Sequence, residues 1–470
     1  MESEIKTQFK KFTKGYTFKM LLLAFLILIL LIPLAMFDSL VYERSRTADS
    51  AEADIMEAWG SELVAAGPVI AIPGTRTEEI RTRMERDGEK IDINIIKKPF
   101  TLIIAPQKLN IGANFKTEIR KRGIFSVPLF YGDLAISGVF EPTQALSSLL
   151  PNEEISLDKA ELIISLSSQK GIRKIDQAVW NAKGDDAVLF FQPGNQGQSF
   201  TSEVKSLDSK RSYHHKSGGG IHAAIPEFAA DAKANFNIVI TIHGGRLVRF
   251  LPFGQDTHTD IAADWQSPSF QGSFLPGNSN VKDNGFDATW DINYLSRDIP
   301  LHWKTEGGNR DYSDALFGVN FFRAIDTYSL NIRAVKYAIL FLIVPFLTLF
   351  LFEILTKKRI HPVPYLLSGI ANIIFYLLLL SLSEQIQFYL AYFIAALAII
   401  VMLTLYSRAL LSSWNKSWYM GLVITASYVL LYAVLNAESY ALLIGSIWAF
   451  AIVALVMFLT RKLNWYGSDE

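Results

Sequence analysis

Residues 321–370, FFRAIDTYSLNIRAVKYAILFLIVPFLTLFLFEILTKKRIHPVPYLLSGI, contain the pattern that decides the fold. The stretch begins polar, becomes apolar at Tyr337, leaves the apolar run at Thr356 through the basic cluster 357–359, and becomes apolar again at Val363. Long apolar runs separated by a short basic loop are typical of successive membrane crossings. The stretch therefore predicts the end of a water-exposed domain, one crossing of a bilayer and the start of the next.

Apolar runs of similar length continue through the C-terminal part of the chain. We expect membrane spans at 337–355, 363–382, 388–406, 417–435 and 440–460, each of 19–21 residues. At about 1.5 Å of rise per residue, a helix of that length crosses a hydrocarbon core about 30 Å thick. Together with a first span near the N-terminus, they predict a bundle of six transmembrane helices.

The first span is expected at residues 20–37, eighteen residues without a charge that follow a basic segment at 1–19 with five lysines. A cleaved signal peptide is the alternative, but its apolar part is usually about 7–15 residues long and ends in small residues. This run is longer and ends in Met36 and Phe37 before Asp38. It therefore predicts an uncleaved signal anchor.

The short loops predict the orientation, because lysine and arginine concentrate in loops that stay in the cytoplasm. Basic residues occur in the loops 356–362 and 407–416 and at the start of the tail 461–470, whereas the alternate loops 383–387 and 436–439 contain none. The sequence therefore predicts a bacterial inner-membrane protein with both termini cytoplasmic and a large periplasmic domain between spans one and two.

The segment 38–336 has the composition of a water-soluble domain. It starts with a polar, helix-prone stalk at 38–60, after which short apolar or alternating runs follow one another between Gly- and Pro-rich turns. These runs lie at 68–73, 90–106, 134–140, 161–168, 186–194 and 235–245. No helical periods separate them, so we expect an all-β, sandwich-like domain, built as an antiparallel sandwich or a pair of sheets.

The 470-residue chain is 50% hydrophobic, has a formal net charge of zero and contains no cysteine. The zero net charge gives no reason to expect nucleic acid as a partner. The lack of cysteine excludes disulfides, thiolate metal sites and cysteine nucleophiles. The lipid bilayer is the partner that the composition predicts.

Two segments contain residue types that bind metals in other proteins. His214, His215 and His222 lie in and beside a Gly-rich loop, and the segment 255–260 places His258 among aspartates. Neither segment has the spacing of the known zinc or calcium motifs. We therefore expect solvated loops there, with no metal and no other cofactor.

The sequence motifs of common enzymes are missing. No G-x-S-x-G, P-loop or dinucleotide-binding pattern occurs, and the carboxylates are so scattered that no acid/base pair stands out. We therefore expect no catalytic residues and a protein that is not an enzyme. A hydrolase in the soluble domain is a further alternative, which would need convergent carboxylates or a Ser/His pair.

Four polar residues near or within the predicted spans are candidates for interaction or structural roles. Glu353 lies about one turn from the end of its span, where it can pair with Lys357 at i+4. His361 and Glu384 are in short loops, and Asn372 is near the middle of a span, where a helix–helix hydrogen bond is the expected role. No span centre carries a charge, which argues against an ion-coupled transporter.

We expect residues 321–336 to connect the soluble domain to the bundle. Arg323, Asp326 and Arg333 are expected there at the level of the lipid headgroups, and they complete the set of candidate interaction residues. The basic residues of this connecting segment do not change the predicted orientation, because a large domain crosses the membrane regardless of nearby charges.

Several long segments resemble the CreD family of inner-membrane proteins, which is associated with cell envelope integrity. They lie at 122–140, 250–257, 267–276, 286–297 and 316–398 and begin RGIFSVPLFYGDLAISGVF, FLPFGQDT, SPSFQGSFLP, FDATWDINYLSR and LFGVNFFRAIDTYSL. The resemblance implies a Gram-negative cytoplasmic-membrane protein with one N-terminal span, a large periplasmic domain and a C-terminal bundle. It also implies control by a two-component system that responds to growth or cell-wall stress, and it carries over no activity, cofactor or ligand.

We therefore expect a non-enzymatic scaffold or binding protein that maintains the cell envelope in the stress response through a wall, lipid or protein partner. The alternative is a transporter or lipid-handling protein that uses the helix bundle. A polar cavity in the centre of the bundle would favour transport. A dry bundle packed with leucine and isoleucine would favour the scaffold.

Overall fold

The computed structural model describes residues 16–84, 90–182, 184–201, 219–306, 310–321, 327–356, 359–437 and 440–461. The chain divides into a helical unit, Met1–Asp49 with Ile325–Glu470, and a β-rich unit, Ser50–Ala324. The predicted fold class is confirmed, because a large β-rich domain is inserted between the first membrane-length helix and the others.

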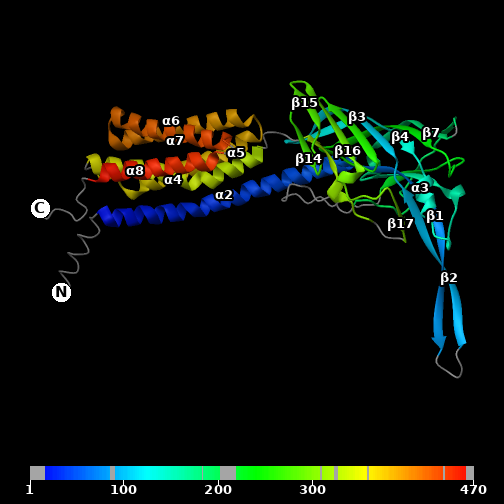
Figure 1. Ribbon diagram of the computed structural model, residues 1–470. Coiled ribbons are helices and arrows are strands. Elements are labelled where there is room, and N and C mark those ends of the chain that lie inside the picture. Colours follow the sequence, from blue (N-terminus) through cyan, green and yellow to red (C-terminus); the bar gives the residue numbers. More distant parts are fainter. Residues whose placement is uncertain are drawn as a thin grey trace. The chain divides into compact units, whose positions relative to one another are not determined.

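Within the described residues, six helices are long and apolar enough to cross a membrane (Figure 1). They are α2 (Tyr16–Trp59), α4 (Thr327–Thr356), α5 (Pro362–Ser383), α6 (Phe388–Leu411), α7 (Trp414–Asn436) and α8 (Ala441–Thr460). Helix α2 continues from the apolar run through the polar stalk, since residues 38–59 contain neither Pro nor Gly, the two residues that most disfavour a helix. It ends directly before Gly60.

The core of the helical unit is aromatic and aliphatic. Helices α2, α4, α5, α6 and α7 each contribute side chains that are at most 2% exposed, among them Leu30, Phe346, Phe375, Ala395 and Leu431. Helix α8 has no buried residue among those whose side chains are described. Its apolar surface is the kind that lipid covers in a membrane.

Ten described strands form the first sheet. Its main path runs in the order β14 (Pro268–Gly272), β18 (Phe317–Phe321), β12 (Leu247–Leu251), β1 (Leu63–Met84), β6 (Glu161–Leu166), β10 (Gly220–Ala224) and β9 (Gln192–Pro193). Off this path, β1 also pairs with β2 (Lys90–Ile104) and β5 (Glu153–Ile155), and β2 pairs with β17 (His302–Thr305).

Eight described strands form the second sheet, in the order β15 (Asn278–Lys282), β16 (Gly285–Asn293), β13 (Asp256–Ala263), β3 (Lys108–Arg122), β4 (Phe125–Phe140), β11 (Ala234–Gly245), β7 (Ile172–Ala182) and β8 (Asp185–Val188). In β11 and β13 every second residue is buried, as expected for strands with one face on a core. A short helix, α3 (Thr143–Ser147), follows β4.

The two sheets pack face to face around one hydrophobic core. Aromatic rings from the two sheets meet there: Phe130 of β4 lies 5.3 Å from Phe321 of β18, and Trp290 of β16 lies 5.7 Å from Phe317 of β18, measured between ring centroids. The sequence favoured antiparallel pairing, and most neighbours are antiparallel. The pairs β1–β12 and β3–β13 are parallel instead. The strands of each pair are far apart in the sequence, which suits parallel neighbours because they cannot be joined by a tight turn.

Strand β1 changes partners at Gly67 and Pro68. Its first residues, up to Ala66, pair with β12, and from Ile70 onward it pairs with β2. Proline has no N–H to donate to the ladder, so pairing is interrupted at this position. Gly67 has φ +115°, and a Cβ there would lie 2.8 Å from the backbone oxygen of Ile163.

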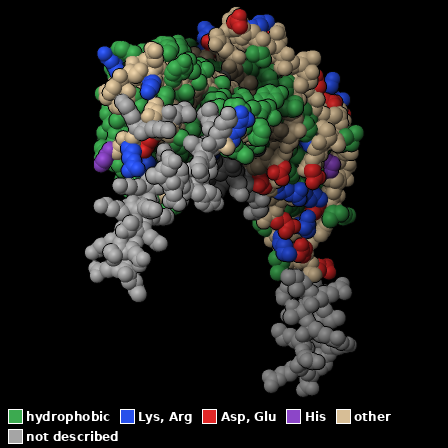
Figure 2. All heavy atoms as spheres, turned by 90° about the vertical axis from the view of Figure 1, so that its left-hand side faces the viewer, with side chains coloured by type: hydrophobic (Ala, Val, Ile, Leu, Met, Phe, Trp, Pro, Cys, Tyr) green, Lys and Arg blue, Asp and Glu red, His purple; other side chains and the backbone are tan. Residues whose placement is uncertain are grey.

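The second half of β1 and the first half of β2 form a hairpin that projects from the sandwich (Figure 1). From Thr77↔Lys97 to Met84↔Lys90, the two strands pair only with each other among the described strands. Figure 2 shows acidic and basic side chains mixed beside the grey end of this hairpin. The ion pair of Lys98 with Glu78, at 2.6 Å, belongs to this region.

The end of α2 that belongs to the β-rich unit packs on the outer face of the second sheet. Met56 is 4% exposed and forms a small buried cluster with Val127 and Leu129 of β4. Asp54 pairs with Arg122 of β3 at 2.9 Å. This helix end is therefore fixed to the sandwich by both apolar and charged contacts.

Candidate functional site

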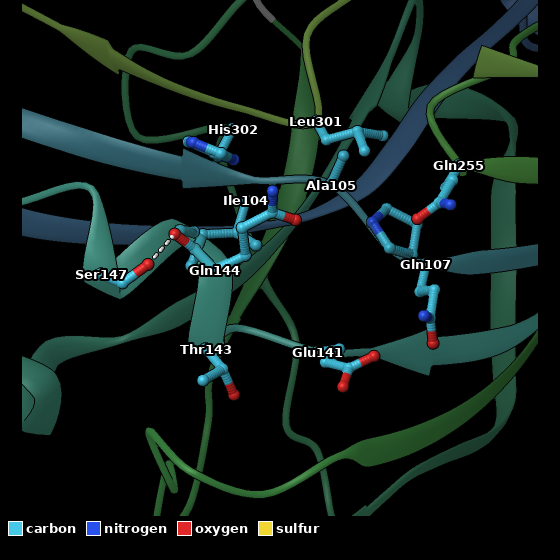
Figure 3. Close-up of a pocket in the computed structure, with 12 residues that line it drawn as sticks. Ile104, Ala105, Gln107, Glu141, Thr143, Gln144, Ser147, Gln255, Leu301 and His302 are labelled. Atoms are coloured by element: carbon cyan, nitrogen blue, oxygen red, sulfur yellow. Dashed lines mark hydrogen bonds between the residues drawn. The ribbon is translucent and has the colours of Figure 1, made fainter. Parts of the chain in front are cut away.

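A pocket of about 360 Å³ lies at one end of the sandwich. Four connections between the two sheets converge there: β2 to β3, β4 to β5, β12 to β13 and β16 to β17. They contribute Ala105–Gln107, Glu141 with α3, Gln255, and Leu301 with His302 (Figure 3). The pocket is therefore a product of the topology, since its walls come from parts of the chain that are far apart in sequence.

Backbone hydrogen bonds join these connections into a frame. The Ala105 N–H donates to Leu301 O at 2.8 Å, and the Gln255 N–H donates to Pro106 O at 2.9 Å. The Gln107 N–H donates to Val139 O at 2.8 Å, which ties the first connection to β4. The residues that line the pocket are thus held by paired main chain.

The pocket has an apolar part and a larger polar part. The apolar residues are Ile104, Ala105, Pro106, Ala145 and Leu301. Figure 3 shows Gln144 and Ser147 of α3 on one side and Gln107 and Gln255 on the opposite side. The polar lining is made of amides, hydroxyls, one carboxylate and one imidazole: Gln107, Glu141, Thr143, Gln144, Ser147, Gln255 and His302.

Most of these polar side chains have no partner within the described part of the protein. The Ser147 hydroxyl donates to the backbone oxygen of Gln144 at 2.8 Å, and Glu141 pairs with Lys233 at 3.1 Å. Side-chain hydrogen bonds to other described residues are absent for Gln107, Thr143, Gln144, Gln255 and His302. Their donors and acceptors are therefore available to a ligand or to water.

Helix α3 is held in place by a buried ion-pair cluster. Glu153 of β5 has a fully buried side chain, which accepts from the Leu150 N–H at 2.9 Å and pairs with Arg76 at 2.8 Å and with Lys304. Lys304 also donates to Ser148 O, at the end of α3, at 3.3 Å. Burial alone would raise the pKa of Glu153, but the Leu150 N–H, Lys304 and Arg76 together lower this pKa to about 2.

Arg297 fixes the opposite side of the pocket. Its guanidinium donates to Phe253 O and Gly254 O, both at 2.7 Å, and to Ile299 O at 2.9 Å. These carbonyls belong to the connections that carry Gln255 and His302. Burial lowers the pKa of Arg297 to about 10. The contact also joins the segments 250–257 and 286–297, two of those by which the sequence resembles the CreD family.

His258 is held between two aspartates on the outer face of the second sheet. Its Nδ1 lies 2.6 Å from Asp291 and its Nε2 lies 3.0 Å from Asp260. The hydrogen bond to Asp291 raises the pKa of this imidazole, and the nearby Asp260 charge raises it further. A ring that donates from both nitrogens is not available to a metal. Within the described residues, no group of three or more His, Asp or Glu side chains is placed to hold one.

Glu353 is buried in the helical unit. The structure pairs it with Lys19 of α2, and Tyr365 of α5 donates to its Oε2 at 2.9 Å. Lys19 also donates to Ile360 O at 2.5 Å. The expected partner Lys357 lies outside the described residues, and the partner that the structure does describe comes from the other end of the chain.

Glu384 occupies a similar position at the far end of α5. Its carboxylate accepts from the Tyr328 hydroxyl at 3.2 Å and lies 3.7 Å from Arg44 of α2. Arg333 lies half-buried on α4. Glutamates therefore fix α2 to the rest of the helical unit near both ends of its apolar run.

Asn372 and His361 have separate local roles. The Tyr428 hydroxyl of α7 donates to Asn372 Oδ1 at 2.7 Å, whereas Asn372 Nδ2 is buried without a hydrogen-bond partner among the described atoms. His361 caps the start of α5, where its Nδ1 accepts from the Val363 N–H at 3.4 Å. Both residues belong to the helical unit, whereas the pocket is lined by residues of the β-rich unit.

Several residues singled out in the sequence lie outside the described part of the chain: Arg323, Asp326, His214 and His215. His222 is described, and both of its ring nitrogens have partners, Gln196 at 2.9 Å and Gly194 O at 3.1 Å. It is therefore a structural residue of β10.

Sequence reasoning missed the pocket residues entirely. The three glutamines are at positions 107, 144 and 255, separated by whole strands, and belong to no motif. It also missed Lys19, which it counted only as one basic residue of the N-terminal segment. The FLPFGQDT segment contains Gln255 and was the one available signal, because the family resemblance included it.

The fold and the pocket define an integral membrane protein with six candidate transmembrane helices and a β-sandwich domain inserted after the first. The family model described as "Inner membrane protein CreD" matches residues 15–466, so the chain belongs to the CreD family. It is similar to the inner membrane protein CreD of Escherichia coli (strain K12), with 29% identity over 442 residues, 94% of this chain and 92% of that relative. The predicted family and inner-membrane location are therefore confirmed.

Proposed function

We propose that this protein is a non-enzymatic binding protein of the inner membrane that supports envelope integrity by holding an envelope component in the pocket of its β-sandwich. The observation that carries the proposal is the polar pocket, in which the side chains of Gln107, Thr143, Gln144, Gln255 and His302 make no hydrogen bonds within the described protein. Concave sites with a few convergent polar groups are the usual form of a ligand site.

The interior of the helical unit supports an anchoring role for the bundle. The groups buried there are mainly aromatic and aliphatic, and the Tyr392 hydroxyl donates to Tyr428 O at 2.6 Å. The unpaired Nδ2 of Asn372 is the observation that favours the transporter alternative. A transporter needs a polar path, and a single amide group does not make one.

A hydrolase is the second alternative, and it is favoured by the presence of Glu141 and His302 in one pocket. The ion pair between Glu141 and Lys233 favours binding, because the carboxylate already has a lysine as its partner. Incubating the full-length protein with a captured ligand separates the two. A binding protein leaves the mass of the ligand unchanged, whereas a hydrolase splits the ligand into products whose masses add up to that of the ligand plus one water.

The proposal places the β-sandwich in the periplasm and both termini in the cytoplasm, on the strength of the basic loops. The natural chain has no cysteine, so in a single-cysteine variant the introduced thiol is the one group of the protein that a maleimide labels. Leu295→Cys and Gln385→Cys should react with a membrane-impermeant maleimide applied to cells with a permeabilised outer membrane. Ser412→Cys should react only after lysis. Reaction of Gln385→Cys and Ser412→Cys under the same condition would contradict the topology.

Photo-crosslinking in cells tests the binding function directly. Thr143 and Gln144 are exposed at the pocket, so a photoreactive amino acid at either position should produce an adduct. Val188, which is 59% exposed on β8, is the matched control. Adducts from the pocket positions that are absent from Val188 support the proposal. Equal yields at all three positions would contradict it.

A further inference from the structure

We propose that the pocket binds an uncharged saccharide of one or two sugar rings. This inference rests on the proposed binding function, and it names the chemical class of ligand for the same pocket. Four properties of the pocket favour such a ligand: the hydrogen-bonding groups of its lining, its charge, its size and its rigidity.

The hydrogen-bonding groups match a ligand rich in hydroxyls. Gln107, Gln144 and Gln255 each present an acceptor oxygen and a donor NH₂ group to the pocket from different connections. The Thr143 hydroxyl can donate and accept, and the ring nitrogens of His302 add further hydrogen-bonding groups. Each sugar hydroxyl also does both, so a saccharide can satisfy this mixed lining. A ligand with acceptors alone would leave the glutamine oxygens unpaired.

The charge of the lining favours an uncharged ligand. Glu141 is the one Asp, Glu, Lys or Arg among the twelve lining residues, and Lys233 lies 3.1 Å from its carboxylate. An anionic ligand such as a phosphate usually requires arginine or lysine in direct contact. A cationic ligand would have to compete with Lys233 for Glu141. The carboxylate remains able to accept from neighbouring hydroxyls of a sugar.

The size and the apolar part of the pocket fit a small saccharide. A volume of about 360 Å³ is near the lower end of ligand pockets, which span about 300–1,000 Å³. Among the apolar lining residues, Leu301 is half-buried and can contact the C–H groups of a sugar ring, whereas Ile104 and Ala145 are each only 2% exposed. No Phe, Tyr or Trp is among the twelve residues that line the pocket, so we expect an affinity on the order of 1 mM.

The lining is rigid enough to select a ligand. Lys304 and Glu153 hold α3, which carries Gln144, and Arg297 holds the connection that carries Gln255. Side chains on a fixed frame lose less conformational entropy on binding. The pocket is therefore preorganised, although its polar groups are widely separated in the sequence.

Saturation-transfer-difference NMR on the full-length protein in phospholipid nanodiscs tests the inference. Nanodiscs are needed because alkyl-glycoside detergents are themselves saccharides. The probes are N,N′-diacetylchitobiose, cellobiose and maltose as uncharged disaccharides, digalacturonic acid as an acidic one, and trialanine as a peptide. We expect saturation transfer to at least one uncharged disaccharide and none to digalacturonic acid or trialanine.

The matched variants are Gln144→Leu with Gln255→Leu in the pocket and Gln177→Leu outside it. Gln177 is exposed on β7, so its substitution leaves the pocket unchanged. The pocket variant should weaken binding of the disaccharide about tenfold or more, because two hydrogen-bonding groups are lost. Gln177→Leu should bind as the natural protein does, and the thermal unfolding midpoints of all three proteins show whether each is folded.

The outcomes separate this inference from the proposed function. Binding of an uncharged disaccharide that is lost only in the folded pocket variant supports the inference. Lack of binding by all three disaccharides, equal binding by the pocket variant, or preference for digalacturonic acid or trialanine overturns it. If photo-crosslinking at Thr143 still captures a partner in cells, the proposed binding function survives that failure. If crosslinking fails as well, both are wrong.

Discussion

The ammonium group of Lys19 forms an ion pair with the buried carboxylate of Glu353, although the two residues are 334 positions apart in the chain. Lys19 lies at the start of α2 and Glu353 near the end of α4. The Tyr365 hydroxyl and the Ile360 carbonyl oxygen complete the hydrogen bonds around them. The pair therefore fixes the first helix against the rest of the bundle.

Removing one partner of this pair should destabilise the protein. Lys19→Met leaves the buried Glu353 without its counter-charge. In the same way, Glu353→Gln leaves Lys19 without its counter-charge. Each single substitution should cost about 3 kcal/mol of unfolding free energy, because an uncompensated buried charge is expensive. The measurement is the thermal unfolding midpoint in nanodiscs, and both single variants should unfold at lower temperature than the natural protein.

The double variant Lys19→Met with Glu353→Gln is the control. With both charges removed, the burial penalty disappears and most of the lost stability should return. If the double variant is as unstable as the sum of the two single variants, the residues act independently and the ion pair does not connect the helices.

Acid should weaken the β-rich unit through Glu153. The pKa of its carboxyl is lowered from an ordinary value of 4.5 to about 2, so the folded protein prefers the ionised form. The stabilisation is complete above about pH 4.5 and is lost as the pH falls through about 2. It corresponds to about 3 kcal/mol at neutral pH. Glu153→Gln should therefore unfold at lower temperature at pH 7, and the difference from the natural protein should shrink toward pH 2.

Glu306→Gln is the matched control for this prediction. Glu306 also pairs with Arg76, at 2.7 Å, but its side chain is 54% exposed. An exposed ion pair contributes little, so the substitution should change the unfolding midpoint only slightly at any pH. An effect equal to that of Glu153→Gln would show that burial is not the cause.

The sequence was sufficient for the membrane architecture because its signals are long and local. A run such as 337–355 is apolar over the full width of a bilayer, and it forms a helix without help from distant residues. The helix-prone stalk at 38–60 joined to the first span could also be anticipated, because no Pro or Gly interrupts residues 38–59. Short alternating runs such as 235–245 were enough to predict strands, but not their neighbours.

The pocket could not be predicted, because it is assembled by long-range pairing. Gln107 and Gln255 become neighbours only because β3 and β13 pair in parallel, from Lys108↔Asp256 onward. An isolated glutamine carries no local signal, and the parallel register is not encoded by alternation alone. The ion pair of Lys19 with Glu353 escaped prediction for the same reason, since a nearer lysine at i+4 was the simpler partner.

His258 should titrate above the ordinary histidine value of 6.5. The hydrogen bond to Asp291, and secondarily the charge of Asp260, raise its pKa by favouring the protonated ring. The interaction is fully present below pH 6.5 and is lost as the pH rises through the raised pKa. NMR titration of the imidazole should show this, and Asp291→Asn should lower the pKa toward 6.5. Asp287→Asn, on the same strand but paired with Lys282, should leave the titration unchanged.

Gly67→Ala should be among the most destabilising small substitutions in the β-rich unit. The backbone there has φ +115°, and the added Cβ would lie 2.8 Å from Ile163 O, an atom of the central strand β6 that cannot move without breaking its ladder. Strain and steric overlap together should cost about 3 kcal/mol. Gly123→Ala is the control, because Gly123 has φ +62° with no heavy atom within 4 Å of the new Cβ. It should cost only about 1 kcal/mol. Equal losses in the unfolding midpoint would mean that the contact with Ile163 adds nothing to the backbone strain.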